Sequence, residues 1–283
     1  MRRRFTIVTG QDRTLELGRR TAVVGVLNLT PDSFSDGREY SDSGAAIDRA
    51  LEMEAEGADI VEIGAESTRP GARAVPADVE LSRLLPVLER LAPRLRVPIA
   101  IDTYKSQVAR VAIGLGAQVI NDVSALRFDP ELVEVVAAAN AVLVLMHMRG
   151  TPEIMQKMET SPDILADIER DLADAVRRAI AAGVCVQKII LDPGIGFGKT
   201  LEQNLEIING LGRLSDLGYP LMLGTSRKGF IGNLTGQPAN QRQFGTAATV
   251  TAAVLNGSHL VRVHDVKEMI DVVRVADALA AAR

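Results

Sequence analysis

Val24-Gly25-Val26-Leu27-Asn28-Leu29-Thr30-Pro31-Asp32-Ser33-Phe34-Ser35-Asp36-Gly37 begins as an apolar run and ends as a loop rich in hydroxyl and carboxylate groups. The apolar part does not alternate with polar residues, which is typical of a parallel strand covered by helices on both faces. The change of character falls on Asn28. Polar side chains at the carboxyl ends of strands form the active sites of α/β enzymes. The stretch therefore predicts an α/β fold with Asn28 at the edge of a functional site.

Seven later apolar runs also end in polar residues. Amphipathic segments separate these runs, which recur at intervals of roughly 25–40 residues. The strand candidates span 21–29, 58–64, 97–102, 118–123, 141–146, 188–192, 220–224 and 259–263. Eight strands alternating with helices favour a single (β/α)8 TIM barrel over a doubly wound sheet. Two short β-prone pieces in residues 1–18 predict a hairpin that closes the bottom of the barrel formed by 19–283. No composition shift or linker points to a second domain.

The helices between these strands carry their own signals. Every fourth residue from 164 to 180 is Ile, Leu or Val, with charged residues between them, which predicts a helix with one buried face. Thr200 followed by Gln203 fits a capping box at the start of another helix. The last helix is predicted over 266–281.

Composition excludes several classes of protein. Lys and Arg number 32 against 36 Asp and Glu, and the net charge of −4 gives no basic surface for nucleic acid. No run approaches the roughly 18 apolar residues of a membrane span. One cysteine, Cys185, allows neither an internal disulfide nor a Cys-based zinc site. We therefore expect a cytoplasmic protein without nucleic-acid or membrane partners.

Every strand candidate is followed by polar groups where it ends. The groups are Asn28, Glu66-Ser67-Thr68-Arg69, Asp102, Asn121-Asp122, Met146-His147, Asp192-Pro193-Gly194, Thr225-Ser226-Arg227-Lys228, and Arg262 with His264. One aspartate before Pro-Gly is more often a turn residue than a ligand-binding residue. Polar groups at all eight strand ends are harder to explain as turns, because these ends meet in one barrel mouth.

Asp102, Asn121, Asp192 and Lys228 suit a planar heterocycle. A carboxylate accepts two hydrogen bonds from an amidine-like edge, an amide both donates and accepts, and a lysine donates to a carbonyl or ring nitrogen. These residue types at strand ends therefore predict a site for a nitrogen heterocycle.

Arg262, His264 and Ser226 suit phosphate oxygens. Asn28 is a candidate Mg2+ ligand, because Mg2+ prefers few protein ligands together with phosphate and water. A heterocycle beside a metal-neutralised phosphate suggests a reaction in which phosphate leaves, with Arg262 and Mg2+ stabilising the departing charge.

For three further features a structural role is a better interpretation than a catalytic or ligand-binding one. The segment 194–199 matches neither a dinucleotide-binding nor a P-loop spacing, so we read it as a turn that lets Asp192 and Phe197 face the mouth. His259 lies at the start of its strand, which is the structural face of a barrel. His147 lies between two methionines, and packing is a better expectation for it than acid–base chemistry.

Taken in order, the motifs resemble those of the dihydropteroate synthase family over nearly the whole chain. The motifs are 27–37 (LNLTPDSFSDG), 66–71 (ESTRPG), 101–103 (IDT), 121–124 (NDVS), 145–148 (LMHM), 192–199 (DPGIGFGK), 226–228 (SRK) and 262–266 (RVHDV). The resemblance implies a homodimeric (β/α)8 barrel of the folate pathway. Its transferase activity joins 6-hydroxymethyl-7,8-dihydropterin diphosphate to 4-aminobenzoate and releases pyrophosphate with Mg2+.

Carried over residue by residue, the resemblance implies a role for each strand end. It assigns pterin binding to Asp102, Asn121, Asp192 and Lys228; diphosphate binding to Asn28, Thr68, Arg262 and His264, with Asn28 on Mg2+; aminobenzoate binding to Thr68, Arg69, Pro70, Phe197 and Ser226; and catalysis to Asp102, Lys228, Arg262 and His264. The implied mechanism is dissociative: pyrophosphate leaves, and the aniline nitrogen attacks a pterin-methyl cation stabilised by the field of Asp102.

The sequence departs from the family pattern mainly in loops. Arg38 and the pair Ala125-Leu126 stand where glycines are usual, Ala65 also replaces a frequent glycine, Glu62 replaces a frequent aspartate, and Gly229 replaces a frequent serine. The loop 30–37 is expected to be a mobile cover, with Asp36 as a candidate outer partner of the metal. Two alternatives stay open: a corrinoid methyltransferase that uses the same pterin barrel, and a non-catalytic pterin-binding protein.

Overall fold

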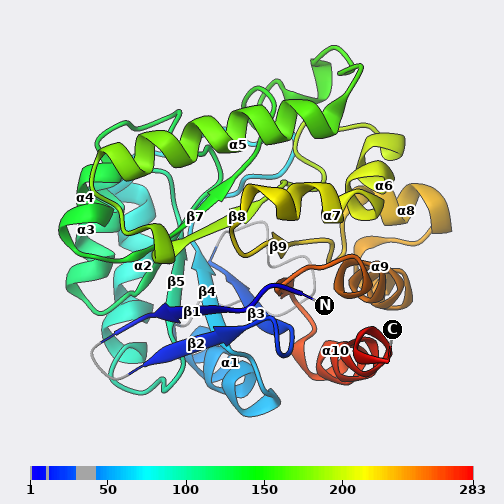
Figure 1. The fold of residues 1–283 in the computed structure, drawn as a ribbon. Coiled ribbons are helices and arrows are strands. Elements are labelled where there is room, and N and C mark those ends of the chain that lie inside the picture. The colour runs from blue at the N-terminus through cyan, green and yellow to red at the C-terminus, as the bar shows by residue number, and fades with distance from the viewer. Residues whose placement is uncertain (1, 11–12, 30–42, 283) are drawn as a thin grey trace.

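The computed structural model describes residues 2–10, 13–29 and 43–282. The predicted cover loop with Asp36, and Arg38 beside it, lie outside the described residues. Figure 1 shows a ring of strands surrounded by helices, with a two-stranded hairpin across one end of the ring.

All eight predicted strands are present, and their ends agree with the prediction to within two residues. They are β3 (Ala22–Asn28), β4 (Ile60–Gly64), β5 (Ile99–Asp102), β6 (Val119–Asp122), β7 (Val142–Met146), β8 (Ile189–Asp192), β9 (Met222–Leu223) and β10 (Leu260–Val263). All are parallel, in the order β8-β7-β6-β5-β4-β3-β10-β9. A parallel bridge between Leu191 and Leu221 joins the two ends of the sheet. The fold is therefore a nearly closed (β/α)8 barrel, as predicted.

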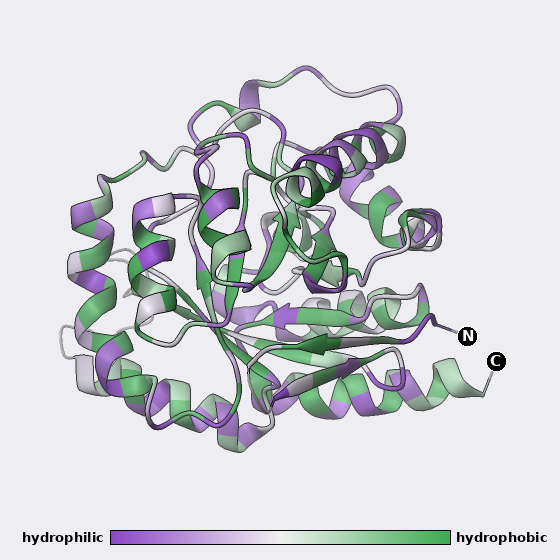
Figure 2. Cartoon of the chain, turned by 60° about the vertical axis from the view of Figure 1, so that its left-hand side comes forward, coloured by the Kyte–Doolittle hydropathy of each residue, from purple (hydrophilic) through white to green (hydrophobic). Residues whose placement is uncertain are grey.

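The helices form the outer layer of the barrel. They are α1 (Ser43–Glu56), α2 (Ala77–Leu91), α3 (Ser106–Gly114), α4 (Leu132–Ala138), α5 (Ile164–Ala181), α6 (Leu201–Asn209), α7 (Leu211–Leu214), α8 (Gly229–Thr235), α9 (Gln243–Leu255) and α10 (Val266–Ala281). Figure 2 shows apolar strands inside and hydrophilic stripes on the outer helices. Within the described residues, no helix is both long and apolar enough to cross a membrane.

The predicted buried stripe of α5 is correct over most of its length. Ile164, Ile168 and Leu172 are buried, but Ile180 is 40% exposed. A step of four residues overshoots one helical turn by about 40°, so the error accumulates along the helix and turns Ile180 away from the core. The capping box of α6 is present, with Thr200 Oγ1 accepting from the Gln203 N–H at 3.2 Å.

The N-terminal hairpin closes the bottom of the barrel. Strands β1 (Phe5–Val8) and β2 (Thr14–Leu17) are antiparallel, and Ile7 and Leu17 pack on the inward-facing side chains of the barrel strands. His259 fastens this end: its Nδ1 accepts from the Leu221 N–H at 3.2 Å, and its Nε2 lies 3.0 Å from the Arg3 carbonyl oxygen. The ring therefore donates from Nε2. The structural role predicted for His259 agrees with these contacts.

Candidate active site

Strand register brings the predicted polar residues to one place. Asp102 pairs with Asn121 on one side and with Gly64 on the other, and Gly64 pairs in turn with Asn28. Side chains alternate between the two faces of a strand, so residues in register point the same way. The lower inward positions are apolar, and the last inward position before the carboxyl end is polar in several strands. The mouth is polar for this reason.

The predicted heterocycle residues line one cleft in this mouth. Its lining is Asp102, Asn121, Val123, Met146, Asp192, Gly194, Ile195, Phe197, Gly224, Lys228 and Arg262. The free volume between them is about 10 Å³, which is about the space of one water molecule. In this conformation the cleft is therefore too narrow for a heterocycle, and Lys228 and Arg262 are the longest side chains in its lining.

Glu62 is a site residue that sequence reasoning missed. It is 1% exposed and accepts from Arg262 Nε at 2.5 Å and from Asn121 Nδ2 at 3.1 Å. Arg262 also donates to Asp102 Oδ2 at 3.2 Å. A signal was present, because Glu62 is the one charged residue in the apolar strand 60–64. A buried carboxylate in such a strand needs a cationic partner.

Two acceptors in the cleft have no partner. Asp102 Oδ1 and Asn121 Oδ1 are buried without a hydrogen bond from any described residue. Buried acceptors without a partner are rare in folded proteins because each costs free energy. Their position in the cleft indicates that a ligand with N–H groups satisfies them.

Asp192 is fixed by the turn that follows β8. Its Oδ1 accepts from the Gly194 N–H at 2.7 Å. Gly194 has φ +68°, and a Cβ there would lie 1.9 Å from the His147 carbonyl oxygen, so only glycine fits. Burial raises the pKa of Asp192 to about 6. The turn thus presents an acceptor that carries full charge only above that pH.

Burial and neighbouring charges shift the pKa values of the acidic and basic groups in the cleft. Burial and the nearby charge of Glu62 raise the pKa of Asp102 to about 8. Burial and the positive charge of Arg262 lower the pKa of Lys228 to about 8, while Asp192 opposes this fall. Lys228 Nζ lies 4.1 Å from the centre of the Phe197 ring. Asp102 and Lys228 therefore both titrate close to neutral pH. A bound ligand can shift the protonation of either group at little cost in free energy.

Lys199 is a second residue whose contacts the sequence did not indicate. Its buried ammonium donates to three carbonyl oxygens, those of Gly194 (2.8 Å), Phe197 (3.1 Å) and His147 (3.2 Å). These three acceptors match the three N–H donors of a protonated lysine, although burial lowers the pKa of Lys199 well below its usual value. The side chain thereby ties the end of β7 to the turn that carries Phe197.

The predicted phosphate-binding residues lie at the neighbouring ends of β9 and β10. Ser226 Oγ accepts from the His264 N–H at 3.2 Å and lies 3.0 Å from His264 Nδ1. Burial and the guanidinium groups of Arg262 and Arg227 lower the pKa of His264 to about 3. His264 is therefore neutral, and in the tautomer whose Nδ1 accepts from the Ser226 hydroxyl its Nε2–H is a donor. Arg227 forms an ion pair with Asp265 at 2.6 Å instead of facing the cleft.

The segment 66–71 lies beside the cleft. Thr68, Arg69 and Pro70 are absent from the described cleft lining, and Arg69 and Pro70 are exposed. Arg69 is close enough to contribute to the lowered pKa of His264. The segment starts at the buried Glu66, which bonds Tyr104 and pairs with Lys105. Thr68, Arg69 and Pro70 therefore lie outside the cleft lining, whereas Phe197, another predicted aminobenzoate residue, is part of it.

Asn28 faces the same space as Asp102. A Cβ on Gly64 would lie 3.5 Å from Asn28 Oδ1 and 3.7 Å from Asp102 Oδ2, so the glycine leaves room between these oxygens. Within the described residues, no group of three or more His, Cys, Asp or Glu side chains could hold a metal.

The loop after Asn121 has an unusual backbone. Ala125 and Leu126 have φ of 51° and 64°, a left-handed conformation that costs about 1 kcal/mol or more for each non-glycine residue. The Asp122 carboxylate accepts from the Ser124 N–H at 2.8 Å and from the Leu126 N–H at 2.6 Å. These bonds stabilise the loop from its inner side.

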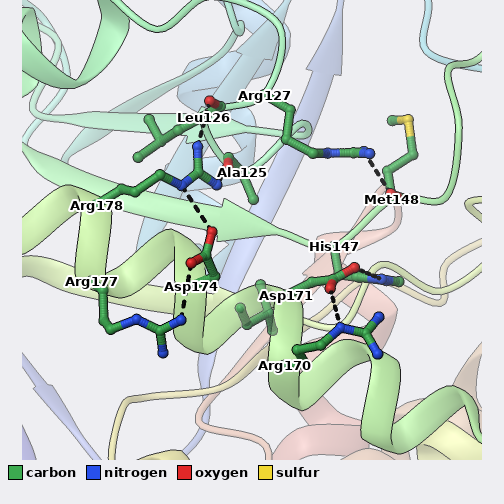
Figure 3. A pocket seen from close by; sticks show the side chains of 11 residues that line it. Ala125, Leu126, Arg127, His147, Met148, Arg170, Asp171, Asp174, Arg177 and Arg178 are labelled. Atoms are coloured by element: carbon green, nitrogen blue, oxygen red, sulfur yellow. Dashed lines mark hydrogen bonds and ion pairs between the residues drawn. The ribbon is translucent and has the colours of Figure 1, made fainter.

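A hollow of about 810 Å³ lies outside the mouth, between α5 and this loop (Figure 3). His147 lines it but is 3% exposed, and burial lowers its pKa to about 4. The ring also lies 3.4 Å from Asp171 through its Nε2, and the packing role expected for it stays a prediction. Arg170 and Arg177 pair with aspartates of their own helix at 2.8 Å and 3.0 Å. Their charges are therefore already balanced, as expected for a solvated helix face.

The comparisons with known proteins agree with this geometry. A model of the pterin-binding enzyme family matches residues 24–264. The dihydropteroate synthase of Synechocystis sp. is 45% identical over 263 residues, which are 93% of this chain and 91% of that one. The fold and the site place the chain among the pterin-binding enzymes.

Two solved structures narrow this class. The dihydropteroate synthase of Clostridium difficile, determined in the presence of pteroic acid, is 42% identical with a TM-score of 0.87, covering 94% of this chain and 98% of that one. The enzyme of Xanthomonas albilineans with 4-aminobenzoic acid is 40% identical with a TM-score of 0.89, covering 99% of both. The chain belongs to the dihydropteroate synthase family, whose members are transferases.

Proposed function

We propose that the chain condenses (7,8-dihydropterin-6-yl)methyl diphosphate with 4-aminobenzoate to give 7,8-dihydropteroate and pyrophosphate. The observation that carries this is the pair of buried, unpartnered acceptors, Asp102 Oδ1 and Asn121 Oδ1, in a cleft that also holds Asp192 and Lys228. A pterin presents the complementary N–H and amino donors along one edge and a carbonyl for the lysine. The relatives solved with pteroic acid and 4-aminobenzoic acid support the same substrate classes.

In the proposed reaction, the chain's own residues hold the pterin and stabilise the separating charges. Asp192, Asn121 and Lys228 bind the ring, and the carboxylate field of Asp102 favours the electron-poor methylene carbon. Arg262 lies between Glu62 and Asp102 and reaches the departing pyrophosphate when it rotates toward the mouth, where the neutral His264 adds a donor. The C–O bond to pyrophosphate breaks first, and the aniline nitrogen then forms the new C–N bond to the methylene carbon and loses its proton.

Asn28 is the residue that we propose to hold Mg2+. Its side-chain oxygen faces the space above Gly64, and phosphate and water would complete the shell of the ion. A bound Mg2+ would neutralise charge on the leaving pyrophosphate.

The function is tested by mixing the pterin diphosphate with 4-aminobenzoate and Mg2+ and measuring pyrophosphate release and dihydropteroate formation. We expect both products in equal amounts, and no release without 4-aminobenzoate. A corrinoid methyltransferase or a non-catalytic pterin-binding protein would release no pyrophosphate, so its absence would refute the proposal.

Pterin binding is expected to depend on pH through Asp192. The ring donors need the ionised carboxylate, and burial raises the pKa of Asp192 to about 6, so affinity falls as the pH drops through that value. Calorimetry with 6-hydroxymethylpterin should show an association constant about tenfold lower at pH 5 than at pH 7.5, because about nine-tenths of the carboxyl is then protonated. An association constant that does not change over this range would contradict an ionised Asp192 as the acceptor.

We also propose a homodimer that forms through helices α6, α8 and α9, which contact one another on one side of the barrel (Figure 1). Three apolar side chains are exposed there: Phe244 by 91%, Leu234 by 57% and Leu205 by 36%. Apolar side chains gathered on one face are typical of an interface between subunits. Light scattering after gel filtration should give about twice the chain mass of 30.3 kDa. A mass of one chain at micromolar concentration would rule the dimer out.

We infer a cytoplasmic location for the enzyme. The single cysteine, Cys185, is exposed and unpaired, a state that a reducing compartment preserves. Fractionation of cells that produce the tagged protein would test this, and recovery outside the cytoplasmic fraction would contradict it.

A further inference from the structure

We propose that Arg178 is a positioning residue of the pterin pocket, which acts from helix α5 on the loop that follows Asn121. The inference rests on the pterin-binding function proposed above. Arg178 does not line the cleft. Its guanidinium donates from Nη1 to the Leu126 carbonyl at 2.9 Å and from Nη2 to the Ala125 carbonyl at 3.0 Å, as Figure 3 shows. A planar fork that bonds two successive carbonyls fixes their direction as well as their place.

The loop needs this support because both carbonyls belong to left-handed residues without glycine. Asp122 stabilises only the N–H side of the loop. The hollow of about 810 Å³ adjoins the carbonyl side. Without Arg178, these carbonyls would face water, and the loop would be free to relax toward ordinary backbone angles.

A change in the backbone of this loop would displace residues that line the cleft. Asn121 and Val123 both line the cleft and lie within five residues of Leu126 along the chain. Arg127 couples the same loop to the segment that follows β7, since it donates from Nη2 to the Met148 carbonyl at 2.5 Å. Of the residues assigned to 4-aminobenzoate, Phe197 lines the cleft, whereas Thr68, Arg69, Pro70 and Ser226 belong to other segments. Arg178 should therefore affect pterin affinity and leave the second substrate largely unchanged.

Helix α5 supplies a matched control in the adjacent residue. Arg177 and Arg178 both pair with Asp174, at 3.0 Å and 3.2 Å, but only Arg178 reaches the loop. Both side chains are substantially exposed, 70% and 42%, so neither replacement by methionine removes core packing. The two variants differ mainly in the loop contacts.

The experiment compares Arg178→Met with Arg177→Met and the wild type, using 6-hydroxymethylpterin in calorimetry and the KM of both substrates in turnover. We expect Arg178→Met to raise the pterin Kd about tenfold, because small displacements of binding groups have effects of this size. Arg177→Met should stay within about twofold, and the KM for 4-aminobenzoate should not change in either variant. Arg178→Lys, which reaches one carbonyl at most, should give an intermediate Kd.

Ala125→Gly provides a rescue, because glycine adopts positive φ without strain. Combined with Arg178→Met, it should recover about threefold of the lost affinity, while alone it should change little. An unchanged Kd in Arg178→Met, an equal loss in Arg177→Met, or no recovery with Ala125→Gly would each overturn the proposal. Wild-type protein that does not bind the pterin at all would instead refute the proposed function.

Discussion

Replacing Asp192 with asparagine is expected to weaken pterin binding by about 100-fold or more while the fold stays intact. The carboxylate has two acceptor oxygens, and one of them already accepts from the Gly194 N–H. An asparagine can keep that bond with its own oxygen. It must then turn its NH2 group toward the N–H edge of the pterin, so an attraction becomes a contact between two donors.

Calorimetry with 6-hydroxymethylpterin would measure the loss, and thermal unfolding would confirm that Asp192→Asn is folded. Asp216→Asn, on an exposed side chain, is the control for the loss of one negative charge. Stability should not fall, because Asp192 is buried and its ionised form is disfavoured there, as its raised pKa shows. Pterin binding equal to that of the wild type would remove Asp192 from the site.

The fold could be predicted because its signals are local and repeated. Apolar runs mark the strands, and their parallel register follows from helices between them. Strand β9, predicted over 220–224, proves to be two residues long. Pro220 precedes it and offers no N–H for a ladder, although its carbonyl accepts from the Leu191 N–H at 2.9 Å.

The mouth of the barrel could be predicted because strand ends converge, but the pairing within it could not. Sequence alone does not show that Arg262 lies between Glu62 and Asp102, since the three residues come from different strands. Glu62 was detectable as a charge in an apolar strand. Lys199 was not, because a lysine after a glycine-rich turn gives no sign that its ammonium is buried.

Contacts between outer helices and loops were beyond prediction for a similar reason. Arg178 follows Arg177 on a helix of alternating charges, and nothing in that pattern distinguishes the two. Only the tertiary fold brings Arg178 to the carbonyls of Ala125 and Leu126. The replacement of two usual glycines by Ala125 and Leu126 was visible in the sequence, but its meaning depended on the backbone angles.

Replacing Glu62 with glutamine is expected to lower the free energy of unfolding by about 3 kcal/mol. Glutamine has nearly the same volume, so the change creates no cavity and isolates the effect of charge. Glu62 is 1% exposed and its carboxylate pairs with Arg262 while accepting from Asn121 Nδ2. The variant leaves the buried guanidinium with Asp102 as its nearest carboxylate partner. Denaturant unfolding at pH 7 would measure the loss.

A second readout separates the charge effect from general damage. The charge of Glu62 helps to raise the pKa of Asp102 to about 8, so Glu62→Gln should lower that pKa, which NMR titration of the carboxyl group can follow. Asp271→Asn is the control, because Asp271 and Arg274 form an exposed pair (81% and 75%) whose loss should change stability by less than about 0.5 kcal/mol. If Glu62→Gln and Asp271→Asn lowered stability equally, the strength of the Glu62–Arg262 pair could not be attributed to its burial. If Glu62→Gln lost nothing, Asp102 would suffice as the partner of Arg262, and Glu62 would serve mainly to keep Asp102 protonated until a ligand enters.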